Sequence, residues 1–322
     1  MSADRQAIEA AADLKVSLPA SLEPWAGLIT DALQGVCKGA SANGLKLDSL
    51  RLIAVVIDMR AAALEWQREL GEPESGVSDT PHGVVAGKTI TWMRRSGDPV
   101  PCAVVIFNAE LLPALLDRSG PALVALIHEL AHVHEQAMAL NAGHGAPPGY
   151  TRDIPALRRC IASLIWEEYF AERFAASWIA EDDFDVANWT LLVQEKHEHI
   201  NALRSEFYRT RDVQVFWDTA VTQIADAGQA IGRALGRFAS RPELQAQFVE
   251  GLSIGPRWQR LARAMVGILD ELYAGALDAS PAAGVKLAPL MADLWEEHGV
   301  RWEEHVGANC RIAIANRDDT LV

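Results

Sequence analysis

The chain has 322 residues, 43 acidic against 29 basic side chains, and a formal net charge of −14. Half of the residues are hydrophobic and 22% are charged, so a sizeable core can be buried, and the disordered and fibrous classes are excluded. The acidic balance argues against a nucleic-acid surface or an anionic-membrane surface, because both need clustered lysine and arginine. We therefore expect neither nucleic acid nor a membrane as a partner.

No targeting signal is evident. Residues 1–6 are polar and lack the apolar stretch of a secretory signal. No segment is long and apolar enough to suggest a membrane span. A cytoplasmic protein is the expectation, and the sequence leaves its oligomeric state open.

The first 70 residues are expected to be helical. Leu50, Ile53, Ile57 and Leu64 recur at helical spacing, with an end near residues 71–73. The stretch that follows, 72–82, is rich in Gly, Pro, Ser and Asp, which predicts a loop.

A pair of β-prone runs follows at residues 84–92 and 102–107. The turn-rich segment 96–101 separates them. This pattern predicts two antiparallel strands of a small sheet.

Helix is predicted for most of the remaining chain. A helix starts near Ser119-Gly120-Pro121 and runs to about residue 141, a proline-containing loop covers 141–155, and a second helix spans about 154–180. Further helices are predicted at about 188–210, 212–238, 242–253, 256–277 and 286–306. The expected fold is α+β and mostly α-helical, divided into an N-terminal helical region (1–75), a core (76–180) and a C-terminal helical domain (181–322).

The first long helix carries the motif His128-Glu129-Leu130-Ala131-His132. Residues four apart lie one above the other on a helix, so His128 and His132 can offer two imidazole nitrogens to one ion. Glu129 is rotated by about 100° from His128 and can reach a water on the metal rather than the metal itself. An HExxH sequence on a helix is typical of zinc sites with two ligands and a general base. The apolar run 122–127 predicts a buried helix, in which unpartnered polar side chains would be costly.

A catalytic zinc ion needs a third protein ligand and one open position. The helix predicted at 154–180 offers Glu168 and Glu172 on one face, whereas Glu167 points elsewhere. The small residues Ala171 and Ala175 would let this helix approach the HELAH helix closely.

Two parts of the sequence resemble a known family. Residues 168–175, E-Y-F-A-E-R-F-A, resemble the E-x-x-A-[D/E/N]-x-F-A element of the gluzincin metallopeptidases. The run 104–108, followed by the HELAH helix, is similar to the minimal gluzincin core of ImmA- and IrrE-like proteins. The resemblance covers about residues 84–180. It implies a small sheet, the HExxH helix and a third-ligand helix, to which this chain adds helical regions.

The resemblance also assigns roles to residues. It makes Glu168 the third zinc ligand and Glu172 an acid that orients a histidine ligand, with Glu172 as ligand the alternative. It further implies a substrate strand added antiparallel to the sheet edge next to the HELAH helix. Either 84–92 or 102–107 would supply that edge.

Several other side chains are candidates for lesser roles. A donor opposite the zinc would stabilise the oxyanion of amide hydrolysis, and His144 and Tyr150 in the 141–155 loop are placed for it. His197 and His199 are rivals for this role. His134 lies about 200° around the helix from His132, so we expect a packed, hydrogen-bonded histidine there.

Together these features predict a zinc-dependent metallopeptidase, an endopeptidase acting on a protein or peptide substrate. Zinc would polarise the scissile carbonyl and acidify a water, while Glu129 takes the proton and passes it to the leaving amine. One alternative is a zinc-stabilised protein-binding or regulatory module in which peptidase activity is lost or incidental. Another is hydrolysis of a non-peptide amide by the same residues.

Overall fold

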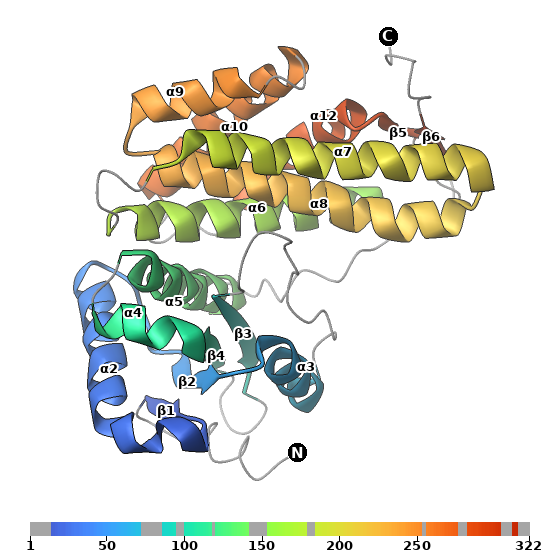
Figure 1. Ribbon diagram of the computed structural model, residues 1–322. Helices are drawn as coiled ribbons and strands as arrows, with labels where there is room; N and C mark the ends of the chain where they lie inside the picture. The colour runs from blue at the N-terminus through green and yellow to red at the C-terminus, as the bar shows by residue number, and fades with distance from the viewer. Residues whose placement is uncertain are drawn as a thin grey trace. The chain divides into compact units, whose positions relative to one another are not determined.

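The computed structural model describes residues 14–71, 86–94, 100–117, 120–141, 153–178, 184–252, 256–275, 282–303 and 311–314. These residues form a mostly helical protein with a small mixed β-sheet (Figure 1). The chain divides into two compact units: residues 1–146 with 174–182, and residues 147–173 with 183–322. Among the described residues, no helix combines the length and apolar character that crossing a membrane requires.

The first unit contains a four-stranded sheet in the order β1-β2-β4-β3. Its strands are β1 (Lys15–Ser17), β2 (Leu50–Val56), β3 (Gly87–Met93) and β4 (Pro101–Asn108). The pairs β1–β2 and β2–β4 are parallel, and β3–β4 is antiparallel. The predicted antiparallel pair is therefore confirmed, with β3 at the end of the strand order and β4 inside it.

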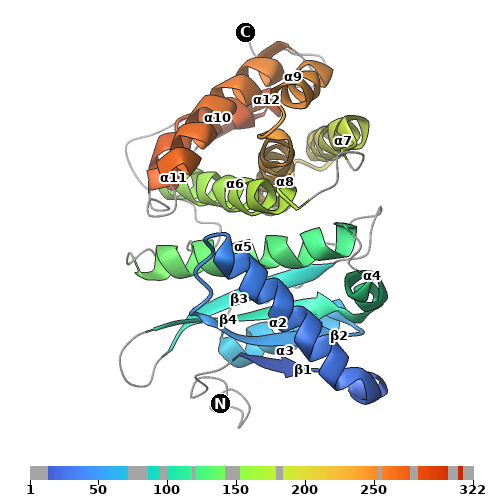
Figure 2. The same cartoon turned by 90° about the vertical axis from the view of Figure 1, so that its left-hand side faces the viewer.

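Helices cover both faces of this sheet (Figure 2). On one face α3 (Met59–Leu70) packs through Met59, Ala63 and Leu70 on alternate residues of β2, β3 and β4. On the other face α5 (Gly120–Asn141) contacts β3 and β4. Every residue of β4 is buried as a result. The unit is completed by η1 (Ala20–Trp25), α2 (Ala26–Ala42), η2 (Ala109–Leu111) and α4 (Leu112–Leu116).

The prediction of one helix through residues 50–64 was wrong. Residues 50–56 form β2, and α3 begins only at Met59. The i, i+3, i+4 spacing was misleading because β2 is buried on both faces, so its apolar residues form a continuous run that no periodicity distinguishes from a buried helix. The break is local: the Asp58 carboxylate accepts a hydrogen bond from the Ala61 N–H at 2.9 Å and caps α3.

The second unit is a set of helices with one two-stranded ribbon. Its elements are α6 (Ile154–Ala176), α7 (Val186–Thr210), α8 (Val213–Phe238), α9 (Pro242–Gly251), α10 (Pro256–Gly275), α11 (Ala282–Leu287), α12 (Leu290–Glu297), β5 (Val300–Glu303) and β6 (Arg311–Ile314). The helices predicted at 154–180, 188–210, 212–238, 242–253 and 256–277 are confirmed. The loop prediction at 72–82 lies outside the described residues, as does the loop prediction at 141–155 except at its ends, where α5 ends at Asn141 and α6 begins at Ile154.

The helix predicted at 286–306 was wrong. Here α11 and α12 are separate, and the chain enters β5 at Val300. Gly299 has φ 72°, a left-handed conformation that ends α12 and that glycine adopts without strain.

A stripe of glycines on α8 sets the distance between α8 and α6. Gly228, Gly232 and Gly236 recur every four residues, so they share one face of α8. A Cβ atom on Gly232 would lie 2.6 Å from the Ile165 carbonyl oxygen, and one on Gly236 would lie 2.5 Å from the Tyr169 carbonyl oxygen. The two helices are therefore in backbone contact, which any larger residue would prevent.

A buried histidine pair lies elsewhere in this unit. His197 on α7 and His298 after α12 place their Nδ1 atoms 3.2 Å apart, and His298 is completely buried. Burial, reinforced by the Arg204 cation, lowers the pKa of His197 to about 4. Burial, together with His197 and Arg204, holds the pKa of His298 well below its usual range. Both imidazoles are therefore neutral in the folded protein at neutral pH.

The glycine stripe makes a first prediction. Gly232→Ala should destabilise the protein by about 1–3 kcal/mol, because the new methyl group overpacks against the α6 backbone. Gly267→Ala is the matched control, since a Cβ there meets nothing within 4 Å in α10. That change should be neutral or stabilise by up to about 1 kcal/mol. Urea unfolding followed by circular dichroism measures both, and equal effects would contradict backbone contact.

The histidine pair makes a second prediction. As the pH falls from 6.5 towards about 4, the unfolded chain binds protons that the folded His197 excludes. The free energy of unfolding should therefore fall in this window, by at most about 1.4 kcal/mol per pH unit for each histidine. His298→Asn removes one of the two groups and should give a shallower slope. Urea unfolding monitored by tryptophan fluorescence at several pH values tests this, and identical slopes would refute it.

Candidate metal centre

The two histidines of the HELAH motif face each other on α5. Their Nε2 atoms lie 3.1 Å apart, and the ring planes are inclined at 80°. In a tetrahedral zinc site with bonds of about 2.0–2.1 Å, neighbouring ligand atoms lie about 3.3 Å apart. The Nε2 atoms of His128 and His132 thus have the spacing that one ion requires, and His132 is only 8% exposed.

Glu129 is fixed from strand β3. The Thr89 hydroxyl oxygen lies 2.8 Å from Glu129 Oε2 and 2.9 Å from the Glu129 carbonyl oxygen, so its single proton can be donated to either. A Cβ on Gly87 would lie 2.6 Å from Glu129 Cγ. The lack of a side chain at Gly87 therefore leaves room for this carboxylate, which is 8% exposed.

Lys88 lies on β3 between the two residues that contact Glu129. Burial lowers the pKa of Lys88, and the Glu129 carboxylate opposes part of that change by favouring the charged ammonium. Gly87 and Thr89 thus give Glu129 room and a hydrogen-bond donor.

Glu168 lies on α6 and is held by Arg233 of α8. Arg233 Nε donates to Glu168 Oε2 at 2.6 Å, and Nη2 donates to Oε1 at 2.8 Å. The pair is a two-pronged guanidinium–carboxylate interaction, a geometry specific to arginine. The Glu168 side chain is 11% exposed, against 42% for Arg233.

Glu172, one turn further along α6, forms the corresponding ion pair with Arg237 of α8. The two acids and the two arginines are each four residues apart, so two ion pairs join the same helices one turn apart. The role expected for Glu172 in orienting a histidine ligand stays a prediction.

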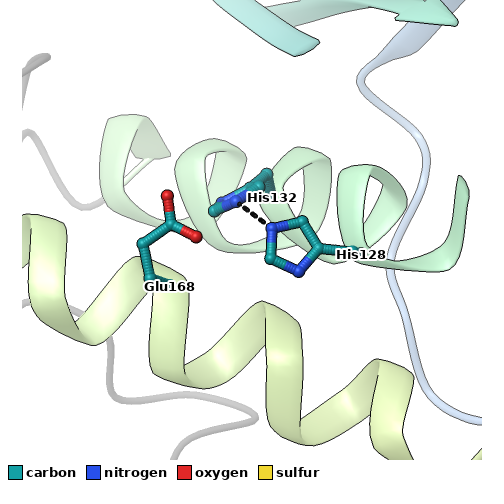
Figure 3. Close-up of side chains that lie close together, drawn as sticks. All are labelled: His128, His132 and Glu168. Atoms are coloured by element: carbon teal, nitrogen blue, oxygen red, sulfur yellow. Dashed lines mark hydrogen bonds between the residues drawn. The ribbon is translucent and has the colours of Figure 1, made fainter. Parts of the chain in front are cut away.

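His128, His132 and Glu168 form one group (Figure 3). Each offers one ligand atom, and these atoms all lie within 4.8 Å of one another. Helix α6 is continuous. Its residues up to Arg173 belong to the second unit, and its residues from Phe174 belong to the first. Two imidazoles and one carboxylate are a donor set of catalytic zinc sites, so these residues fit the metal that the sequence suggests.

The other candidates have different surroundings. His134 is 1% exposed, and its Nδ1 accepts a hydrogen bond from the Lys46 N–H at 2.8 Å, which confirms a packed, hydrogen-bonded histidine. His197 pairs with His298, and His199 is exposed. His144 and Tyr150 lie outside the described residues, so their expected role in stabilising an oxyanion stays a prediction.

Three residues of the site were not predicted from the sequence: Gly87, Thr89 and Arg233. Gly87 and Thr89 sit in a run noted only for its β propensity. Arg233 follows directly on Gly232, and Arg237 on Gly236, in the repeat Gly-Arg-Ala-Leu-Gly-Arg. That four-residue period was a visible signal for a close helix contact flanked by cations.

Comparisons of the chain with protein family models, with curated proteins and with solved structures gave no match.

The position of Gly87 yields a prediction for the site. Gly87→Ala should push the Glu129 side chain from its place against β3, because the added methyl group would overlap Cγ. If Glu129 is the base of a zinc site, as the sequence predicts, hydrolytic activity should fall by at least about tenfold, because catalysis is sensitive to misplacement of a reacting group by about 1 Å. Metal content should not change, since His128 and His132 are not displaced.

Gly35→Ala is the control for this experiment, because a Cβ at that position of α2 meets nothing within 4 Å. Activity and metal content would be measured on both variants. Full activity of Gly87→Ala would contradict the placement of Glu129 against this glycine.

Proposed function

We propose that this chain is a zinc-dependent metallopeptidase of gluzincin type, with His128, His132 and Glu168 as the metal ligands. The observation that carries the proposal is the convergence of these three ligand atoms within 4.8 Å, with Glu129 on the same helical turn as His128. The order of the motifs along the chain supports it. When bound in such a site, zinc polarises a carbonyl group and acidifies a water molecule.

Glu129 is the general base in this proposal. Its carboxylate accepts a proton from the attacking water and delivers it to the leaving amine. Thr89 supports this role because its hydroxyl lies 2.8 Å from Oε2 and fixes the orientation of the carboxylate. Because Glu129 is nearly buried, its orientation is set by the protein rather than by solvent.

The substrate in this proposal is an extended polypeptide that adds to the outer edge of β3. Two observations support this. Among the described strands, β3 ends the strand order, so one of its main-chain edges faces away from β4. The same strand carries Thr89, which contacts the proposed base. A peptide paired with this edge would gain main-chain hydrogen bonds without regard to most of its side chains.

The proposal predicts the zinc content of the protein and the effects of two substitutions. Freshly folded protein should contain about one zinc ion per chain, and His128→Ala should lose it, because two ligands hold zinc far less tightly than three. Glu129→Gln should retain zinc and lower the rate of hydrolysis by about 100- to 10,000-fold. Elemental analysis measures the zinc content. A comparison of new protein termini in cells expressing wild type or Glu129→Gln measures hydrolysis.

Two results would decide against the proposal. Absence of zinc in the freshly folded protein would remove the metal site. If zinc is present and the new protein termini form equally in cells expressing Glu129→Gln, the chain acts instead as a zinc-stabilised binding or regulatory module.

A further inference from the structure

Glu168 is not held by α6 alone. Both of its carboxylate oxygens are engaged by Arg233, at 2.6 and 2.8 Å. The two residues are 65 positions apart in the chain and come from different helices. A glutamate carboxylate that projects from a helix on three rotatable bonds would otherwise sample several rotamers. The fork of the guanidinium selects one of them.

The distance between these helices is fixed by backbone rather than by side chains. Gly232, the neighbour of Arg233, allows α8 to meet the Ile165 carbonyl of α6. Gly236 makes the same approach at Tyr169, so Glu168 lies on the stretch of α6 between these two contacts. Close-packed helix backbones deform little. The backbone of Arg233 is therefore held at a fixed distance from that of Glu168.

Pairing with Arg233 is compatible with metal coordination. An ionised carboxylate offers about four acceptor positions, two on each oxygen. Arg233 takes one position on each oxygen, so a metal can use another position on the same oxygen. Carboxylate ligands are commonly hydrogen-bonded in this way, and the bond orients them.

We infer that Arg233 is a positioning residue for the metal site: its two-pronged contact holds Glu168 in the orientation of the third ligand. The inference rests on the proposed zinc site and adds to it a residue on α8, a helix beyond the stretch that resembles gluzincins. The planar fork, rather than the positive charge alone, does the positioning. Replacing arginine by lysine therefore separates the two contributions, because lysine keeps the charge but offers no fork.

The test measures metal binding rather than catalysis. Zinc affinity of the full chain is determined by competition with a chromophoric chelator, and the visible absorption of bound Co²⁺ reports the ligand geometry. Arg233→Ala should bind zinc about 10- to 100-fold more weakly than wild type. Arg233→Lys should fold normally, bind with intermediate affinity and give a Co²⁺ spectrum altered from that of wild type.

Asp270→Asn is the matched control. Asp270 of α10 pairs with Arg173, about one turn beyond Glu168 on α6, and accepts a hydrogen bond from the Tyr169 hydroxyl, so its loss loosens the same part of the helix without touching Glu168. Unchanged zinc affinity in Asp270→Asn, with weaker binding in both Arg233 variants, supports the inference. Equal affinities of wild type and the Arg233 variants would overturn it while leaving the zinc site intact. An equal loss in Asp270→Asn would also overturn it, and a wild-type chain that binds no metal would overturn both proposals.

Discussion

The backbone contact between α6 and α8 is the constraint on which the proposed site depends. Gly232 and Gly236 remove the side chains that would keep the helices apart, and the carbonyl groups of Ile165 and Tyr169 fill the space. Two ion pairs then cross the contact, Arg233 with Glu168 and Arg237 with Glu172. Because Glu168 is nearly buried, an unpaired carboxylate there would be costly, and the arginine offsets that cost. The close packing of the helices and the two ion pairs thus both constrain the part of α6 that carries Glu168.

Strand β3 plays the corresponding part for the proposed base. Gly87 gives Glu129 room, and Thr89 gives it a hydroxyl group. Both contributions come from the same face of one strand, so a short piece of β3 holds the carboxylate. The sheet is small, yet it is the element that gives the base its orientation.

Sequence patterns predicted some of these features and missed others for physical reasons. The HELAH helix and the pair of strands β3 and β4 follow from periodicity, and the convergence of Glu168 with His128 and His132 is what the resemblance to gluzincins implies. Strand β2 was missed because a strand buried on both faces has no alternation to detect. The partner of Glu168 was missed for another reason. Arg233 is 65 residues away, and helix periodicity says which residues share a face but not which helix lies opposite.

The contact between Thr89 and Glu129 has a consequence for proton transfer. While Glu129 is ionised, the Thr89 hydroxyl donates its proton to Oε2 at 2.8 Å. Once the carboxyl group has taken up a proton on that oxygen, it can donate in return, and the hydroxyl can rotate to donate to the Glu129 carbonyl oxygen at 2.9 Å. Both arrangements use the same heavy-atom positions. A threonine at this point therefore lets the acid gain and lose its proton by rotation of one O–H bond, with no rearrangement of the chain around it.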